Sequence, residues 1–152
     1  MSPNKSSIGV DQCHCFAMRK AARQITRLYD SHLQPTGLRI TQFLILAALN
    51  QEQGVSINDL AERLDTERTA MGKMVGVLER DGFVRLRPSP TDGRSRLVEL
   101  TTDGKGLFEQ AAPLWREAQR QFSDMNGAKD VRTLRQSLSG MKTGDLGNST
   151  FE

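Results

Sequence analysis

Two thiols near the start of the chain are the side chains with the most evident reactivity. Cys13 and Cys15 flank His14 where a segment with helical spacing of apolar residues begins. A thiolate is favoured at a helix N-terminus by the helix dipole, and the cations Arg19 and Lys20 follow closely. Two cysteines make no disulfide framework, and with one histidine they lack the fourth ligand of a closed zinc site. The sequence leaves open whether these two thiols are reactive or are inert side chains at an interface.

A second set of candidate residues lies on one face of the segment from Glu67 to Arg80. Its apolar residues recur at helical spacing and predict a buried stripe: Met71, Met74, Val75 and Leu78. The opposite face carries small and basic residues, and each of its glycines costs about 1 kcal/mol of helix propensity relative to Ala. The major groove of DNA admits one helix. The candidate DNA contacts on this helix are Arg68, Thr69, Ala70, Gly72 and Lys73, the alternative being an ordinary exposed helix face.

A third candidate site is the tip of a predicted hairpin that follows this helix. Residues 83–87 and 94–100 alternate as strands, with the turn-rich residues 88–93 between them. Arg94 is placed to enter a narrow minor groove, whose negative potential attracts Arg. Asp92, Ser95 and Arg96 complete the candidate site, and we expect Asp92 to form a salt bridge with Arg94 or Arg96. An arbitrary surface hairpin is the alternative.

Charge and composition favour a polyanion partner over a catalytic role. The net charge is only +3, but residues 68–96 hold seven basic and three acidic side chains, and residues 16–39 hold five and one. We find no nucleophile paired with a base, no paired catalytic carboxylates and no metal cluster. We therefore predict no catalytic residues, metal site or cofactor. A thiol-based, peroxide-reactive protein remains the enzymatic alternative.

The elements that must position these residues are mostly helices. Ser56, with Asp59 three residues later, is an N-cap candidate for a short helix ending at Leu64, and Thr101 is a cap candidate for a later one. The order of these elements predicts a winged helix-turn-helix in a mainly α chain with a small β-hairpin wing. That order is helix, tight turn, helix, strand, loop and strand. The other predicted helices are 13–34, 41–50, 102–125 and 129–141, with a loop over 51–55.

Several motifs in order resemble the MarR family, the multiple-antibiotic-resistance regulators. The most specific is Asp92-Gly93-Arg94-Ser95-Arg96, which is similar to the family's wing signature. It leads into Val98-Glu99-Leu100-Thr101, with Gly104 three residues on. The other matching runs are Gly37-Leu38, Thr41-Gln42-Phe43, Leu60 to Leu64, and Val75 with Leu78 to Val84.

The resemblance implies a homodimer that binds near-palindromic duplex DNA. The interface would use residues 13–36 and 102–142, and the winged helix-turn-helix lobe would be residues 40–100. Most relatives repress transcription and release DNA when a small aromatic or phenolic acid binds. Arg19, Arg23 and Arg27 recur at helical spacing and form a basic stripe. This stripe is a candidate effector site, the alternative being an ordinary solvated face. Tyr29 is a further candidate effector contact.

The run from Cys15 to Met18, with Ala21-Ala22-Arg23, is similar to the branch of the family that senses organic hydroperoxides. This resemblance implies oxidation of Cys15 to a sulfenic acid, with Cys13 as the resolving thiol. Two features depart from the pattern of this branch. Arg19 stands where an aromatic residue is usual, and a second cysteine lies two residues from the first. A disulfide between two residues so close within a helix is awkward, which favours a bond between subunits.

We expect one domain over residues 13–142, preceded by a disordered arm over 1–12 and followed by a flexible tail over 143–152. The start resembles no secretory signal and no apolar run is long enough to span a bilayer, so we expect a cytoplasmic protein with no membrane partner. A protein-interaction module that retains the fold without binding DNA is a further alternative.

Overall fold

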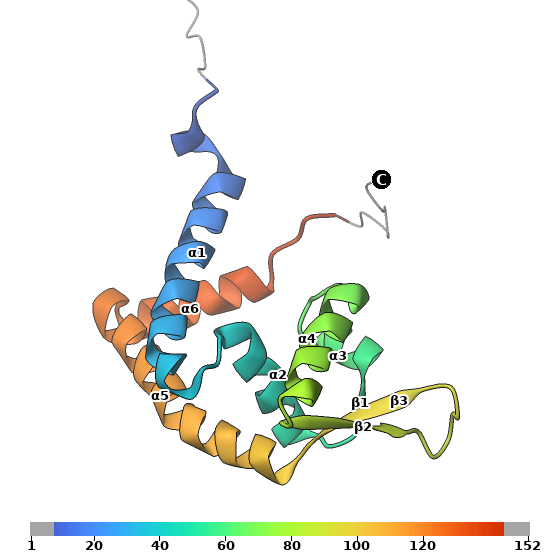
Figure 1. Cartoon of the computed structure of the whole chain (residues 1–152). Coiled ribbons are helices and arrows are strands. Elements are labelled where there is room, and N and C mark those ends of the chain that lie inside the picture. Colours follow the sequence, from blue (N-terminus) through green and yellow to red (C-terminus); the bar gives the residue numbers. More distant parts are fainter. Residues whose placement is uncertain (1–7, 145–152) are drawn as a thin grey trace, which may run out of the picture.

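Six α-helices and a three-stranded antiparallel sheet make up the computed structural model, which describes residues 8–144 (Figure 1). The helices are α1 His14–Leu33, α2 Ile40–Gln51, α3 Ile57–Arg63, α4 Arg68–Arg80, α5 Thr102–Asn126 and α6 Ala128–Ser139. The strands are β1 Val55–Ser56, β2 Val84–Pro88 and β3 Arg96–Leu100. The predicted mainly α fold with a hairpin wing is confirmed. No helix among residues 8–144 is both long and apolar enough to cross a lipid bilayer.

Parts of the predicted arm and tail, residues 1–7 and 145–152, lie outside the described residues. Within the described part, the last three residues of the predicted arm, Val10–Gln12, form a 3-10 turn that leads into α1. A second 3-10 turn, Gln34–Thr36, follows α1, and Gly37 after it adopts a left-handed backbone with φ 75°. This turn reverses the chain between α1 and α2.

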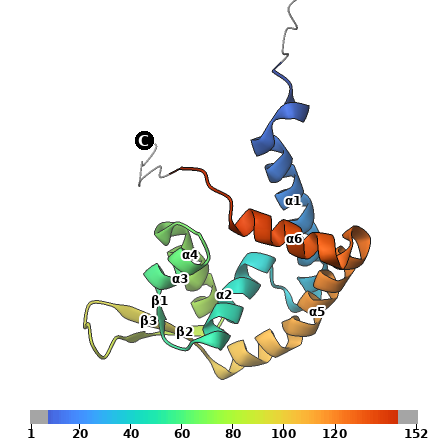
Figure 2. The ribbon, with the colours of Figure 1, turned by 180° about the vertical axis from the view of Figure 1, so that it is seen from behind.

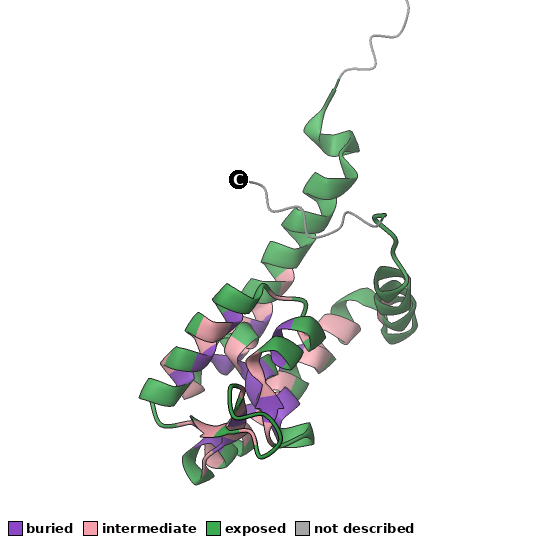
Figure 3. Cartoon of the chain, turned by 90° about the vertical axis from the view of Figure 1, so that its right-hand side faces the viewer, coloured by how far each residue is buried: buried purple, intermediate pink, exposed green. Residues whose placement is uncertain are grey.

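The core of the molecule is built around α2, which is apolar on nearly all sides. Its buried side chains are Phe43, Ile45, Leu46, Ala48 and Leu49. A helix that is apolar on nearly all sides must be covered over most of its surface. Helices α3, α4 and α5 and the sheet supply that cover, and the buried residues gather in this lobe (Figure 3). We call residues 40–100 the DNA lobe.

The sheet has the strand order β1-β3-β2. The prediction of a loop through Val55 was wrong at its end, because Val55 and Ser56 pair with Val98 and Leu97 of β3. A strand of two residues is too short to show alternation, so only the tertiary pairing reveals it. The second wing strand begins at Arg96 rather than Arg94, because residues before it fold into the wing tip.

The helices at the two chain ends lie outside the DNA lobe. Figures 1 and 2 show α1 projecting away from the lobe, and α6 contacts the end of the chain's longest helix, α5. Only the second half of α1 packs, where Tyr29 and Leu33 are buried against the rest of the chain. Tyr29 donates a hydrogen bond to Gln119 of α5, and Nε2 of His32 lies 2.6 Å from Oε1 of Gln121. These contacts fix the second half of α1 on α5 and leave its first half exposed.

Two leucines of α2 provide a matched test of this core. We expect Leu46→Ala, at a side chain with 0% exposure, to lower the free energy of unfolding by about 2–5 kcal/mol. Leu44→Ala, at a side chain 40% exposed on the same helix, is expected to lower it by less than about 1 kcal/mol. Urea denaturation followed by circular dichroism measures both. Equal losses would show that α2 is not the centre of the core.

Candidate nucleic-acid interface

The helix-turn-helix begins at a side-chain cap and turns through one unusual backbone conformation. Ser56 Oγ accepts a hydrogen bond from the Asp59 amide at 3.1 Å, which confirms the predicted cap of α3. Between the helices, Asp65 has φ 48°, a left-handed conformation that Asp tolerates better than most residues. The Thr66 amide then donates to the Ala61 carbonyl at 2.8 Å. This short turn sets α4 across α3 with its apolar stripe inward.

The outer face of α4 carries the predicted contact residues in a solvent-facing row. Arg68, Thr69, Ala70 and Lys73 are exposed, whereas Met71 on the opposite side is fully buried. A Cβ added at Gly72 or Gly76 would meet no atom within 4 Å. No contact among residues 8–144 therefore requires glycine at these positions. Arg68 and Lys73 form no ion pair within the described part of the chain, so both cations are available to a partner.

The wing tip is ordered by Asp92, but not in the predicted way. Its Oδ1 accepts from the Arg94 amide and its Oδ2 from the Ser95 hydroxyl, each at 3.0 Å. The expected salt bridge between Asp92 and Arg94 or Arg96 was wrong, because both carboxylate oxygens are used to close the turn itself. In the described residues the Arg94 and Arg96 side chains form no ion pair and are exposed.

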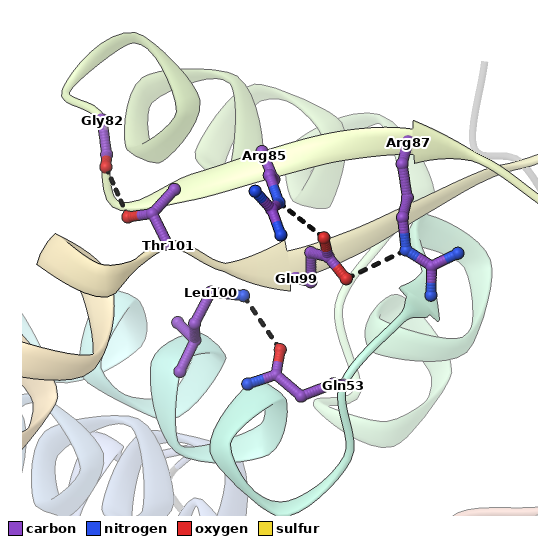
Figure 4. Close-up of polar contacts among 7 residues, drawn as sticks. All are labelled: Gln53, Gly82, Arg85, Arg87, Glu99, Leu100 and Thr101. Atoms are coloured by element: carbon purple, nitrogen blue, oxygen red, sulfur yellow. Dashed lines mark hydrogen bonds and ion pairs between the residues drawn. The ribbon is translucent and has the colours of Figure 1, made fainter.

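An acidic side chain that the sequence analysis missed holds the two wing strands together. Glu99 of β3 lies between two arginines of β2, with Oε1 2.5 Å from Arg85 Nε and Oε2 2.9 Å from Arg87 Nε (Figure 4). Hydrogen bonds from the two arginines hold the pKa of the Glu99 carboxyl below its usual value, and the bond from Arg87 contributes more than the bond from Arg85. The signal was present in the alternation, which places Arg85 and Arg87 on one face of a strand opposite Glu99.

The four predicted effector and redox residues do not form one site. Cys13 lies outside α1 as its N-cap, and its Sγ accepts from the Phe16 amide at 3.4 Å. Cys15 sits in the first turn, and both thiols are free and exposed. Arg19 is exposed further along α1, whereas Tyr29 is buried about 21 Å from Cys15 along the helix. Burial raises the pKa of Tyr29, whose hydroxyl is engaged with Gln119.

The surface of residues 8–144 includes two hollows that none of those four residues lines. One of about 340 Å³ lies at the start of α5, beside Arg85 and Lys105. The other, of about 290 Å³, lies between α1 and α2, where Asp30 and Arg39 are part of its lining. Among residues 8–144, no three His, Cys, Asp or Glu side chains gather as a metal-binding group.

Comparison with known proteins relates this arrangement to a family. The family model described as "MarR family" matches residues 36–95, which cover nearly the whole DNA lobe. The structure of the M. tuberculosis transcriptional regulator MosR in complex with DNA is 34% identical, with a TM-score of 0.71. That match covers 84% of this chain and 97% of the MosR chain. The chain belongs to the MarR family.

Curated MarR-type relatives match over shorter segments. The transcriptional activatory protein BadR of Rhodopseudomonas palustris is 32% identical over 100 residues, which are 64% of this chain and 57% of BadR. The organic hydroperoxide resistance transcriptional regulator of Bacillus subtilis is 27% identical over 100 residues, 66% of this chain and 68% of that protein. The chain thus spans less than two thirds of the length of BadR.

Glu99 yields a prediction on pH dependence. Glu99→Gln removes the carboxylate that pairs both strands, so we expect a lower melting temperature than wild type at pH 7. A depressed folded-state pKa stabilises the fold above the unfolded-state value, about 4.3 for Glu. That stabilisation is lost as the pH falls through the folded-state pKa, so the two melting curves should converge in acid.

Thermal unfolding between pH 7 and pH 2.5 measures the effect, and Glu109→Gln, at an exposed glutamate of α5, serves as the matched control. A deficit of Glu99→Gln that stays constant across this range would contradict the role of the carboxylate.

Proposed function

We propose that this MarR-family chain is a sequence-specific, duplex-DNA-binding transcription regulator. The observation that carries the proposal is the pair of unpaired cationic surfaces on one lobe: α4 with Arg68 and Lys73, and the wing tip with Arg94 and Arg96. One helix fits the major groove while a basic hairpin reaches the adjacent minor groove. The relative MosR, 34% identical, was solved in complex with DNA, which supports the same use of this fold.

We further propose that the chain acts as a homodimer through both of its ends. Large apolar side chains are exposed on the terminal helices, with Met125 at 61%, Leu134 at 50% and Leu138 at 49% exposure. Phe16 and Met18 add to them from the first half of α1. Leu134 and Leu138 lie one turn apart on the same face of α6, and neighbouring exposed apolar side chains of this kind indicate an interface. Two-fold symmetry would then match a near-palindromic operator.

The proposed signal for release is oxidation of the thiols by an organic hydroperoxide. The Cys15 thiolate attacks the peroxide O–O bond, which gives a sulfenic acid and an alcohol. The Cys13 thiol then condenses with the sulfenic acid, which forms a disulfide and releases water. Exposure of both thiols and the name of the Bacillus subtilis relative support this proposal. Because Cys13 is an N-cap with extended backbone, the two cysteines are not both helical, and a disulfide within one chain and one between subunits are both candidates.

A small aromatic or phenolic acid is the second candidate effector. The hollow between α1 and α2 includes Arg39, an exposed cation that could pair with a carboxylate. Asp30 in the same hollow accepts a hydrogen bond from the Ile40 amide at 2.8 Å, so part of its charge is already engaged. In either case we propose a repressor, whose release from DNA by the effector restores transcription.

Removal of the wing-tip cation tests DNA binding directly. We expect Arg94→Ala to weaken binding to a duplex selected from random sequence by about 1–3 kcal/mol. Wild-type affinity should itself fall steeply with added salt, because phosphate contacts release counterions. Gel-shift titration measures both. Arg116→Ala, at an exposed arginine of α5, is the matched control. Equal affinities of Arg94→Ala and the control would favour an interaction module that retains the fold without DNA binding.

Thiol sensing is tested on the same duplex. One equivalent of cumene hydroperoxide should release wild-type protein, whereas Cys15→Ser should remain bound. In Cys13→Ser the reaction should stop at the sulfenic acid, which mass spectrometry detects after trapping with dimedone. A Cys15→Ser protein that still releases the duplex would rule out this sensor. Repeated turnover of peroxide in the presence of thiol would instead indicate a peroxidase.

A further inference from the structure

The recognition helix ends in a motif that leaves two carbonyls pointing out of it. Helix α4 closes with the Gly82 amide donating to Glu79 O at 3.0 Å and the Phe83 amide donating to Leu78 O at 2.9 Å. This is a Schellman motif, and Gly82 takes the left-handed φ of 84° that it requires. The motif satisfies the last carbonyls of α4. It leaves the carbonyls of Gly82 and Phe83 to find partners elsewhere.

Both of those carbonyls are bound by one residue, Thr101. Its hydroxyl donates to Gly82 O at 2.6 Å (Figure 4). Its amide donates to Phe83 O at 3.1 Å. The same hydroxyl oxygen accepts from the Gly104 amide at 3.0 Å, which makes Thr101 the N-cap of α5. One side chain therefore closes the start of α5 and the end of α4 together.

We call this contact between the end of α4 and the start of α5 the joint, and it is also closely packed. A Cβ built at Gly104 would lie 1.9 Å from the Phe83 carbonyl oxygen, so the first turn of α5 rests directly on the backbone that ends α4. On the other side, the Leu100 amide donates to Gln53 Oε1 at 3.1 Å, and the Leu100 side chain is buried (Figure 4). The chain around Thr101 is thus held from three directions.

We propose that Thr101 is a positioning residue that locks the recognition helix α4 to α5, so that the dimer fixes the spacing at which two copies of α4 meet DNA. The inference rests on the proposed function, in which α4 enters the major groove and α5 belongs to the dimer interface. Inserting one base pair between half-sites moves them about 3.4 Å further apart and rotates them by about 35°. A rigid joint makes such a shift unfavourable, whereas a loosened joint lets each lobe follow its half-site.

The variant that separates the joint from the cap is Thr101→Asp. Aspartate caps a helix as well as threonine does, so Gly104 keeps its acceptor, but a carboxylate cannot donate to Gly82 O. Thr101→Ser keeps the donor and the acceptor. Thr102→Asp introduces the same charge one residue later, at an exposed side chain that makes no hydrogen bond among residues 8–144.

The probe is the duplex recovered by selection with wild-type protein, together with duplexes whose half-sites are one or two base pairs closer or further apart. Light scattering establishes that each variant is a dimer. We expect wild type, Thr101→Ser and Thr102→Asp to share one steep preference for the selected spacing. For Thr101→Asp the ratio of affinities between selected and shifted spacings should fall by about 3–30-fold, the range typical of altered coupling between sites. A spacing profile identical to that of Thr102→Asp would overturn the proposal.

Hydrogen exchange of the unsubstituted protein gives a second readout that depends on neither folding of a variant nor DNA. If the joint opens as a unit, the amides of Phe83, Thr101 and Gly104 should show similar protection. Exchange of the Thr101 amide that is a hundredfold faster than that of Phe83 would overturn the proposal. Failure of wild type to select any duplex would instead overturn the proposed function.

Discussion

Burial of α2 is the interaction on which the rest of the fold depends. A helix with Phe43, Ile45, Leu46 and Leu49 all buried leaves only a narrow strip to water, so its neighbours are arranged around most of it. Phe43 stacks on both Phe108 and Trp115, with ring centroids 5.6 and 5.9 Å apart, and these stacks tie α2 to α5. On the other side α3 and α4 close the lobe. The surfaces proposed to meet DNA are therefore carried by elements whose inner faces are fixed by one apolar helix.

Local signals predicted most of this architecture. The caps at Ser56 and Thr101 and the apolar stripe through Met71, Val75 and Leu78 each depend on neighbours within a few residues, and all are present in the structure. The short strand β1 escaped prediction because its pairing partner lies more than forty residues away. The contact between Gly104 and Phe83 also escaped prediction, because no periodicity in the sequence relates the two residues.

In the candidate site, too, features set by local sequence were predicted and features set by tertiary geometry were missed. Exposure of Arg68 and Lys73 follows from helical periodicity, and the structure agrees with it, whereas Arg94 is exposed because it lies in the wing tip before β3. The partner of Asp92 did not follow, because a carboxylate near two arginines has backbone amides within reach as well, and geometry alone decides between them. The effector and redox residues stay a prediction. Cys15 and Arg19 lie one turn apart on the exposed first half of α1, whereas Tyr29 lies further along the helix and faces α5.

The order of the wing tip has a consequence for the thermodynamics of association. Ser89 Oγ accepts from the Thr91 and Asp92 amides, each at 3.3 Å, and the Ser89 amide donates to Ser95 O at 2.9 Å. With the bonds of Asp92, these contacts fix the loop backbone in the free protein. Ordering a mobile loop at an interface would oppose binding entropically, and a preorganised loop avoids most of that penalty. The remaining entropy loss at the tip falls on the arginine side chains, so the loop backbone itself adds little to the cost of association.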